Sequence, residues 1–429
     1  MGGPKLEEIY RTAVGEKVFK WELNNGLTLF VMPRNNFRKQ YAVFAAGCGS
    51  IDLNFINPEN NEKTKVPAGT AHFLEHKLFE DKKQSIFNSF ASLGSSTNAY
   101  TGFTNTSYLF SGTINFQESL IRLIDFVQDP YFTEDNVEKE KSIIAREINM
   151  YEDKPGWQIY FKLLQGLFNK HPVRYDIAGT IESIKKITAE DLNVFYNTFY
   201  HPGNMVLFVT GDLLPEKIYN LVAENQMKKR FNNRGEPKKI YPDEPDYICE
   251  EKIKLDMDVS LPYFSLGYKE NNLDNNSYEQ IKQEIATNML LDIILGKSSF
   301  LYKKLYNENL IDENFSVNYR CEDSYGYVKI SGKSPEPEKL FNKIILGLKD
   351  CEQYINNNNF ERIHKKYFGN FIASFNSFEQ TASEFITFYF RKVNLMESIN
   401  ILDNISLSDL NKQYNNLFLN RTPVQVIIS

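Results

Sequence analysis

The chain has 429 residues, of which 42% are hydrophobic and 24% are charged, and its formal net charge is −6. This length and composition indicate a globular protein of two or more domains. The acidic balance argues against a nucleic-acid partner, which requires a basic face.

Two further classes are disfavoured by the distribution of apolar residues and cysteines. No apolar run approaches the ~20 residues of a membrane-spanning helix, so we expect no membrane span. The four cysteines are widely scattered, and no apolar secretory segment follows Met1. These features predict a cytoplasmic protein with reduced thiols.

The first half of the chain alternates short apolar runs with helical patterns. Residues 17–23 and 27–32 flank Asn24-Asn25-Gly26, which is typical of a β-hairpin turn. Further strands are expected at residues 41–46, 97–101, 107–113 and 205–210. Helices are expected at residues 67–80, 86–93, 116–127, 135–150, 157–168 and 189–199.

The periodicity is lost between residues 228 and 251, where prolines, glycine and charges accumulate. We interpret this segment as an interdomain linker. It separates a first α+β domain, residues 1–227, from a second, residues 252–429, that has no metal site.

Two segments half a chain apart resemble each other. ITAEDLNVFYNTFY begins at Ile187 and ISLSDLNKQYNNLF begins at Ile405, and an apolar strand follows each. A chance match between two helix starts is the alternative, but we interpret the pair as an internal duplication. Each copy is expected to be a largely antiparallel sheet with helices packed on one face.

The segment GTAHFLEHKLFE, residues 69–80, holds two of the chain's five histidines. On a helix, His72, Glu75 and His76 project from one face. Two imidazoles at this spacing can bind one metal ion, and imidazole with carboxylate favours zinc. Glu75 can then accept a proton from a metal-bound water. A lone histidine is more often a packing residue, but a histidine pair around a glutamate is rare by chance.

A catalytic zinc needs a third protein ligand, and the helical segment VEKEKSIIAREINMYEDKP offers two glutamates. Glu140 and Glu147 are seven residues apart and face nearly the same way. Glu147 is a candidate ligand, and Glu140 is a candidate hydrogen-bond partner of a ligand histidine. An exposed acidic stripe is the alternative that the spacing leaves open.

The run His72-Phe73-Leu74-Glu75-His76 is the inverted HxxEH motif of zinc peptidases. The chain resembles the superfamily of insulin-degrading enzyme, pitrilysin and mitochondrial processing peptidase. The stretches AREINM, SSTNAYTGFTNTSYLF and TFYHPGNMVLFVTGD extend this resemblance over nearly the whole chain. FLEHKLFE and HPVRYDIAGTIESI look like the bacterial YmfH-like branch.

The resemblance implies a zinc metalloendopeptidase that hydrolyses extended, unfolded peptides between two domains arranged as a clamshell. It implies one zinc ion per chain, held by His72, His76 and Glu147, with Glu75 as the general base. It also matches Glu140 to the family's second acidic residue. The substrate is expected to add a strand beside residues 97–101 and to contact Asn98, Ala99 and Tyr100.

One family feature is missing from the second half. Family members often carry an arginine and a tyrosine there that hold the substrate carbonyl. Tyr306 stands in place of the arginine, and Phe315 stands near the place of the tyrosine. We therefore expect a paralogous, non-catalytic subunit to supply this pair in a heterodimer, with a homodimer as the other arrangement. The alternative function is a non-enzymatic partner or scaffold subunit of a peptidase complex.

Overall fold

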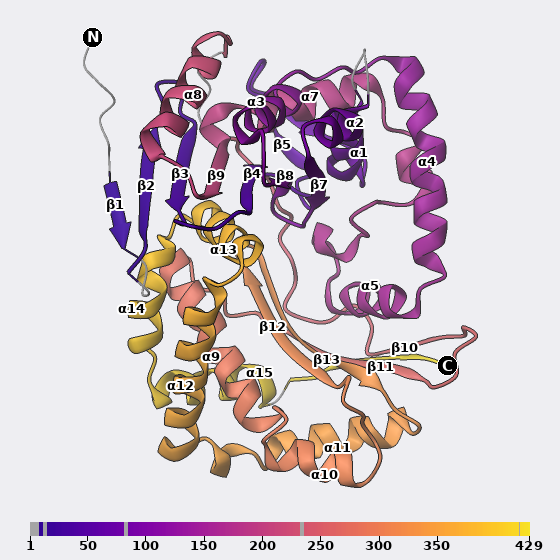
Figure 1. Cartoon of the computed structure of the whole chain (residues 1–429). Coiled ribbons are helices and arrows are strands. Elements are labelled where there is room, and N and C mark those ends of the chain that lie inside the picture. The colour runs from indigo at the N-terminus through magenta and orange to yellow at the C-terminus, as the bar shows by residue number, and fades with distance from the viewer. Residues whose placement is uncertain (1–7, 12–14, 81–84, 232–235, 420) are drawn as a thin grey trace. The chain divides into compact units, whose positions relative to one another are not determined.

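The computed structural model describes residues 8–11, 15–80, 85–231, 236–419 and 421–429. Within these residues, no helix is long and apolar enough to cross a membrane. The chain divides into two compact units (Figure 1). Unit 1 comprises Met1–Ile148, Asp176–Tyr241 and Ile372–Met396, and unit 2 comprises Asn149–Tyr175, Pro242–Phe371 and Glu397–Ser429.

Unit 1 contains a seven-stranded sheet in the order β1-β2-β3-β9-β4-β8-β7. Its strands are β1 (Glu8–Arg11), β2 (Lys17–Glu22), β3 (Thr28–Pro33), β9 (Met205–Gly211), β4 (Gln40–Ala46), β8 (Thr106–Gly112) and β7 (Ser95–Thr101). Only β3 and β9 are parallel neighbours among these strands. The predicted hairpin joins β2 to β3, and Gly26 has the positive φ of 88° that its turn requires. A separate short hairpin pairs β5 (Asn54–Ile56) with β6 (Lys63–Lys65).

The helices of unit 1 contribute buried apolar side chains to its core. They are α1 (Thr70–Leu78), α2 (Ile86–Ser92), α3 (Phe116–Val127), α4 (Glu134–Glu152), α6 (Ile181–Ile184), α7 (Ala189–Phe199), α8 (Pro215–Met227) and α13 (Phe378–Phe390). In α3, Leu120, Leu123 and Ile124 recur at helical spacing and are fully buried against the sheet. Each such side chain contributes about 2 kcal/mol to folding.

Unit 2 contains a five-stranded sheet in the order β10-β14-β11-β13-β12. Its strands are β10 (Lys252–Leu255), β14 (Val424–Ile428), β11 (Tyr263–Lys269), β13 (Tyr325–Lys333) and β12 (Ser316–Glu322). Its helices are α5 (Pro155–Leu167), α9 (Ser277–Ile294), α10 (Phe300–Asn307), α11 (Pro337–Lys349), α12 (Asn357–Ser374, whose last turn falls in unit 1), α14 (Ser398–Asp403) and α15 (Leu407–Phe418).

The two units repeat one topology. The strand order β3-β9-β4-β8-β7 of unit 1 matches β10-β14-β11-β13-β12 of unit 2, including the single parallel pair at the start. The chain order α1-α2-β7-β8-α3-α4-α5-α6-α7-β9 likewise matches α9-α10-β12-β13-α11-α12-α13-α14-α15-β14. The predicted fold class, two duplicated α+β domains, is confirmed.

Each unit contains one helix from the other half of the sequence. Helix α5 precedes the linker but packs on β11 and β14 of unit 2. Gly267 leaves room for it, because a Cβ there would lie 2.7 Å from Leu163 Cδ1. The corresponding helix α13 follows the linker but packs on β4 and β9 of unit 1, where Phe385 contacts Phe208. The predicted boundaries, residues 1–227 and 252–429, do not include this exchange.

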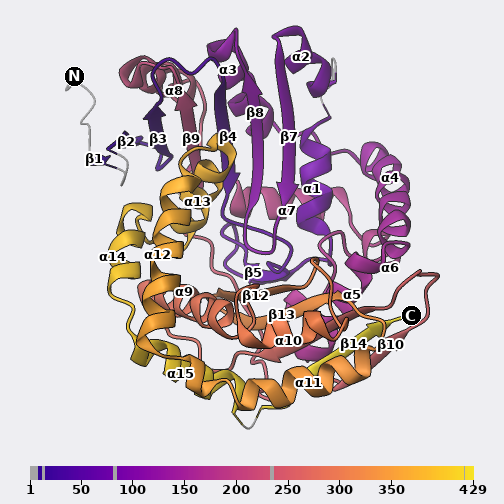
Figure 2. The same cartoon turned by 60° about the horizontal axis from the view of Figure 1, so that its bottom comes forward.

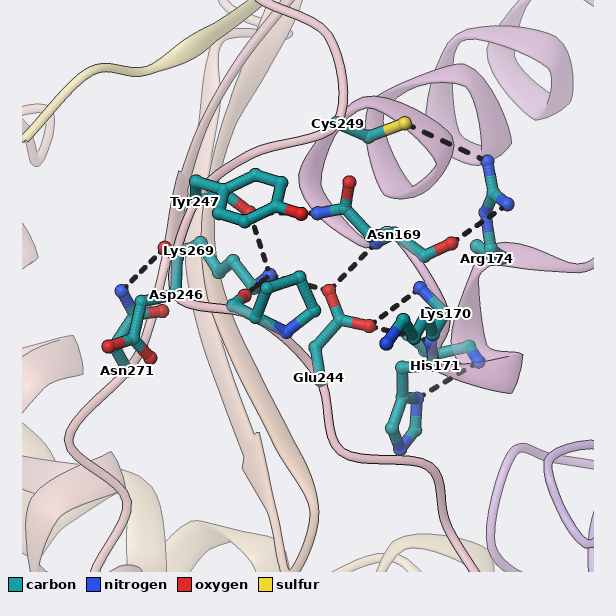
Figure 3. Close-up of polar contacts among 12 residues, drawn as sticks. Asn169, Lys170, His171, Arg174, Glu244, Asp246, Tyr247, Cys249, Lys269 and Asn271 are labelled. Carbon is teal, nitrogen blue, oxygen red and sulfur yellow. Dashed lines mark hydrogen bonds and ion pairs between the residues drawn. The ribbon is translucent and has the colours of Figure 1, made fainter.

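Within the predicted linker, residues 236–251 are bound to both units in turn. Its first part belongs to unit 1, where Ile240 donates its N–H to Asn54 O and Tyr241 donates its hydroxyl to Asp52. Its second part belongs to unit 2, where Glu244 accepts hydrogen bonds from three consecutive backbone N–H groups (Figure 3). The segment is therefore attached to the folded units by specific contacts.

Candidate metal centre

Helix α1 presents the histidine motif because its other face is apolar. Phe73, Leu74 and Leu78 are buried in the core of unit 1, against β7, β8 and α7. The start of the helix is fixed at Gly69, whose φ is +94° and where a Cβ would lie 2.5 Å from Ala178 O. A larger residue does not fit there, so the backbone itself sets the position of the motif.

Helix α4 brings the two glutamates of the second motif to α1 (Figure 2). Val137, Ile144 and Ile148 are buried on its inner face, and Glu140 is buried with them at 5% exposure. The two helices are also joined by Lys77, which is fully buried and donates from Nζ to Asn136 O at 3.1 Å. Lys77 forms an ion pair with Glu80 as well.

Three of the residues singled out in the sequence converge at one point. His76 Nε2 lies 3.3 Å from Glu147 Oε2, and His72 Nε2 lies 3.7 Å from Glu147 Oε1. One ligand atom from each of the three residues lies within 4.8 Å of the others. In the part of the chain that the structure describes, no other group of three or more histidine, cysteine or acidic residues could hold a metal ion.

Glu140 orients one of the two imidazoles. Its Oε1 lies 3.0 Å from His76 Nδ1, so Nδ1 donates to the carboxylate and Nε2 faces Glu147. A carboxylate that holds the far nitrogen of a ligand histidine fixes both the ring and its tautomer. Although burial opposes it, the contact with His76 holds the pKa of Glu140 below its usual range.

The two histidines have opposite charge tendencies. Burial, together with the nearby His76, lowers the pKa of His72 to about 4, so this ring is neutral at neutral pH. Burial also acts to lower the pKa of His76, but hydrogen bonds to Glu140 and Glu147 outweigh it and raise the pKa to about 10. The carboxylates around His76 therefore attract positive charge to the centre of this cluster.

The donor set fits a zinc ion. Two imidazoles and one carboxylate, with room for a water molecule, are the ligands of many catalytic zinc sites. Bond lengths of about 2.0–2.1 Å in a tetrahedral site place the ligand atoms roughly 3.3 Å apart, close to the distances from Glu147 to the two histidines. His72 Nδ1 is buried and has no hydrogen-bond partner among the described residues, so the polar contacts seen for this ring lie on its Nε2 side.

Glu75 lies beside these ligands and is held by strand β7. Thr101 Oγ1 donates a hydrogen bond of 2.6 Å to Glu75 Oε2. Burial raises the pKa of Glu75, although the hydrogen bond from Thr101 opposes this. Thr101 was not among the site residues predicted from the sequence. Strand alternation could have found it, since Thr97, Ala99 and Thr101 share the more buried face of β7.

Strand β7 forms one edge of the unit 1 sheet, as the resemblance implied. Asn98 and Tyr100 are exposed on it, and Ala99 is half-buried. Asn98 Oδ1 accepts a hydrogen bond from the N–H of Ala99 at 2.9 Å. This N–H therefore points away from β8, to the edge where another strand can pair.

Two other histidines have structural roles, and neither position in unit 2 that was compared with the family's arginine and tyrosine carries a charge. His171 and His201 cap short 3-10 turns by accepting from the N–H two residues later. In unit 2, Tyr306 is exposed on α10, whereas Phe315 is buried in the core at 6% exposure. Neither Tyr306 nor Phe315 can perform the charge-bearing role of an arginine.

Comparisons with known proteins match both halves of the chain to the same peptidase family. Residues 60–181 match the family Insulinase (Peptidase family M16), and residues 186–367 match the Peptidase M16 inactive domain. The zinc protease YmfH of Bacillus subtilis (strain 168) is 42% identical over 395 residues, 92% of each chain. The zinc protease PqqE of Helicobacter pylori is 26% identical over 73% of this chain and 69% of that protein. A crystal structure of an M16-like peptidase from Alicyclobacillus acidocaldarius is 36% identical with a TM-score of 0.92, and covers 96% of this chain and 98% of its own.

Proposed function

The chain belongs to the insulinase family of peptidases, family M16, and on that basis we propose that it is a zinc metalloendopeptidase. The observation that carries this proposal is the convergence of His72, His76 and Glu147 within 4.8 Å of one another. Glu75 lies on the same helix, directly before His76, and is the proposed general base.

The residues would divide the work of peptide-bond hydrolysis. Zinc held by His72, His76 and Glu147 would supply Lewis acidity, which acidifies water and polarises the scissile carbonyl. Glu75 accepts a proton from the attacking water on Oε1, because Oε2 is already bonded to Thr101. It then passes that proton to the leaving amine. Glu140 keeps His76 Nε2 directed at the reacting centre.

We propose that the substrate is an extended peptide that pairs with β7. An edge strand offers unpaired N–H and C=O groups to a peptide main chain, which gives affinity with little demand on sequence. Ala99 supplies one such N–H, and the side chain of Asn98 must release it when a peptide carbonyl binds. Asn98 and Tyr100 project from the exposed face of the strand.

A partner subunit would complete this site. Neither Tyr306 nor Phe315 offers a cation to a substrate carbonyl, so a paralogous non-catalytic subunit, or a second copy of this chain, would contribute the missing contacts. The rival function, a non-enzymatic subunit, agrees with the match of residues 186–367 to the Peptidase M16 inactive domain. The complete donor set in unit 1 favours the enzyme.

The test compares the zinc-loaded chain with its Glu75→Gln variant on a pool of unstructured peptides. We expect slow cleavage by the isolated parent, detected by mass spectrometry, and none by the variant, with equal zinc content in both. Cleavage by the isolated parent at ordinary turnover would count against the requirement for a partner. Cleavage at the parental rate by Glu75→Gln would refute the role of Glu75. Zinc binding without cleavage by the parent would support the requirement for a partner.

A further inference from the structure

The place in unit 2 that corresponds to the metal centre is a pocket. Helices α9, α10 and α12 and strand β12 are the counterparts of α1, α2, α4 and β7 (Figure 1). A cavity of about 440 Å³ opens among these four elements. This volume lies within the range of sites for small molecules and short peptide segments.

The residues of this pocket differ in type from those at the corresponding positions of the metal centre. Asn288 and Asp292 of α9 line the pocket and lie six and two residues before the helix ends at Ile294. His72 and His76 lie at the same two distances from the end of α1, so Asn288 corresponds to His72 and Asp292 to His76. Helix α12 lines the pocket with Arg362 and Lys366, whereas α4 supplies two glutamates to the metal centre. The duplicated position has changed from acidic to basic.

The charges of the pocket exclude a metal cation and favour an anion. Asp292 is its only carboxylate among the lining residues, and Oδ2 accepts from Lys366 Nζ at 2.7 Å. Arg362 donates to Ser298 Oγ at 3.0 Å, and within the described residues neither Arg362 nor Lys297 has a carboxylate partner. Two positive charges thus remain uncompensated at the mouth of the pocket.

The pocket also has an apolar floor. Leu291, Leu295, Phe315 and Ile363 are buried beneath the charged groups, and the rings of Tyr302 and Tyr367 stand beside them. A ligand that fits this combination has an anionic head group and an apolar body. The guanidinium of Arg362 is suited to a planar carboxylate, which it can bind through two parallel hydrogen bonds.

The neighbouring strand indicates how such a ligand reaches the pocket. Strand β12 is an edge of the unit 2 sheet, and Val317 on it lines the pocket. Asn288 closes this edge at Tyr319, because its side chain accepts from Tyr319 N at 3.0 Å and donates to Tyr319 O at 3.1 Å. A peptide paired with the open part of the edge must end there, beside the pocket.

From these observations, we propose that the pocket binds the C-terminal carboxylate of a peptide whose last residue is apolar. Arg362 and Lys297 take the carboxylate, and the buried floor takes the terminal side chain. This binding requires neither zinc nor hydrolysis, so the inference goes beyond the proposed peptidase function and is tested separately from it.

The experiment measures peptide binding by fluorescence anisotropy on the full chain carrying Glu75→Gln. The protein is freed of metal so that the C-terminal carboxylate of the peptide cannot coordinate zinc. The probes are an N-terminally labelled hexapeptide ending in leucine, once as the free acid and once as the C-terminal amide. We expect the acid to bind at least tenfold more tightly, since charge-assisted hydrogen bonds of this kind are worth about one order of magnitude or more in affinity.

A variant on the same helix as Arg362 provides the matched control. The double variant Lys297→Gln/Arg362→Gln is expected to bind acid and amide alike. Lys365→Gln, which removes an exposed lysine of α12 outside the pocket lining, is expected to keep the preference for the acid. Equal binding of acid and amide by the unsubstituted pocket, or an unchanged preference in the double variant with its thermal unfolding midpoint intact, would overturn the proposal.

Discussion

Thr101 Oγ1 donates a 2.6 Å hydrogen bond to Glu75 Oε2, and this contact joins the edge strand β7 to the helix that carries the histidine motif. The strand proposed to bind the substrate therefore also holds the proposed general base. A hydroxyl bonded to one carboxylate oxygen restricts the rotamer of Glu75 and leaves the other oxygen to receive a proton.

Replacing Thr101 with valine should lower kcat while leaving KM and zinc content unchanged. Valine has the same shape but no hydroxyl, so Glu75 loses the bond that orients it. A hydrogen bond to a charged group is worth about 1.5–3 kcal/mol, which corresponds to a decrease in kcat of roughly ten- to a hundredfold. Steady-state kinetics on a fluorogenic peptide, with Thr101→Ser as the variant that keeps the hydroxyl, checks this. Equal kcat for the valine and serine variants would contradict it.

Replacing Glu147 with alanine should abolish tight zinc binding. The two histidines remain, but only two protein ligands then face the site instead of three, and a catalytic zinc site requires three. Metal content after dialysis, measured by mass spectrometry, should fall from about one zinc per chain to near zero. Glu138→Ala, which removes an exposed glutamate of the same helix, is the control and should retain the parental content. Retention of zinc by Glu147→Ala would show that the third ligand is another group.

Short-range patterns predicted the elements of the fold well. Helix α3 and helix α7 begin and end at the predicted residues, because in each a polar residue, Asn115 or Thr188, precedes an apolar stripe. The spacing of His72 and His76 indicated a metal site, and the structure places Glu147 against both rings. These features depend on residues that are close in sequence or on one strong motif.

Long-range features were not visible in the sequence. The exchange of α5 and α13 between the units depends on which sheet each helix covers, and both helices are amphipathic in the same way. The contact between Thr101 and Glu75 joins a strand to a helix 26 residues away, and strand alternation gives the face on which Thr101 lies but not its partner. Only the packing of the two elements reveals either feature.

Unit 2 should lose stability on acidification because of His171. This side chain is 1% exposed, accepts from Val173 N through Nδ1 and contacts Ser324 Oγ through Nε2. Burial lowers the pKa of His171 to about 4. The Glu244 carboxylate acts to raise this pKa, and the positive charge of Lys269 acts to lower it further. Between about pH 6.5 and pH 4 the unfolded chain takes up a proton that the folded chain does not. The stability contributed by the neutral ring is therefore present above pH 6.5 and is lost as the pH falls toward 4.

The free energy of unfolding should fall by about 2 kcal/mol between pH 7 and pH 5. This follows because the loss is about 1.4 kcal/mol for each pH unit below the pKa of histidine in the unfolded chain, about 6.5. Urea unfolding at both pH values measures it. His171→Asn keeps an acceptor for Val173 N but cannot titrate, so its stability should fall less over this interval than that of the parent. Parallel pH dependence in the two proteins would show that His171 is not responsible.

Glu244 should be among the most sensitive positions of unit 2. Its two oxygens accept from the backbone N–H groups of Asn169, Lys170 and His171, each at 2.7 Å, and Oε1 also accepts from Lys269 Nζ at 2.6 Å (Figure 3). The side chains of Glu244 and Lys269 are only 11% and 5% exposed. Despite partial burial, Lys269 and the three N–H groups hold the pKa of Glu244 below its usual range.

Glu244→Gln keeps the size of the side chain but removes its charge. The new amide also turns a donor toward N–H groups that need an acceptor, and Lys269 remains buried without its counter-ion. Breaking a buried pair in this way costs about 3 kcal/mol or more.

The measurement follows Trp157, which lies in unit 2, in a Trp21→Phe background, so that fluorescence reports this unit alone during urea unfolding. Lys254→Gln breaks an exposed pair with Glu338, both side chains being at least 67% exposed, and should change stability by less than about 0.5 kcal/mol. Equal effects of the two substitutions would mean that Glu244 does not anchor the linker to unit 2.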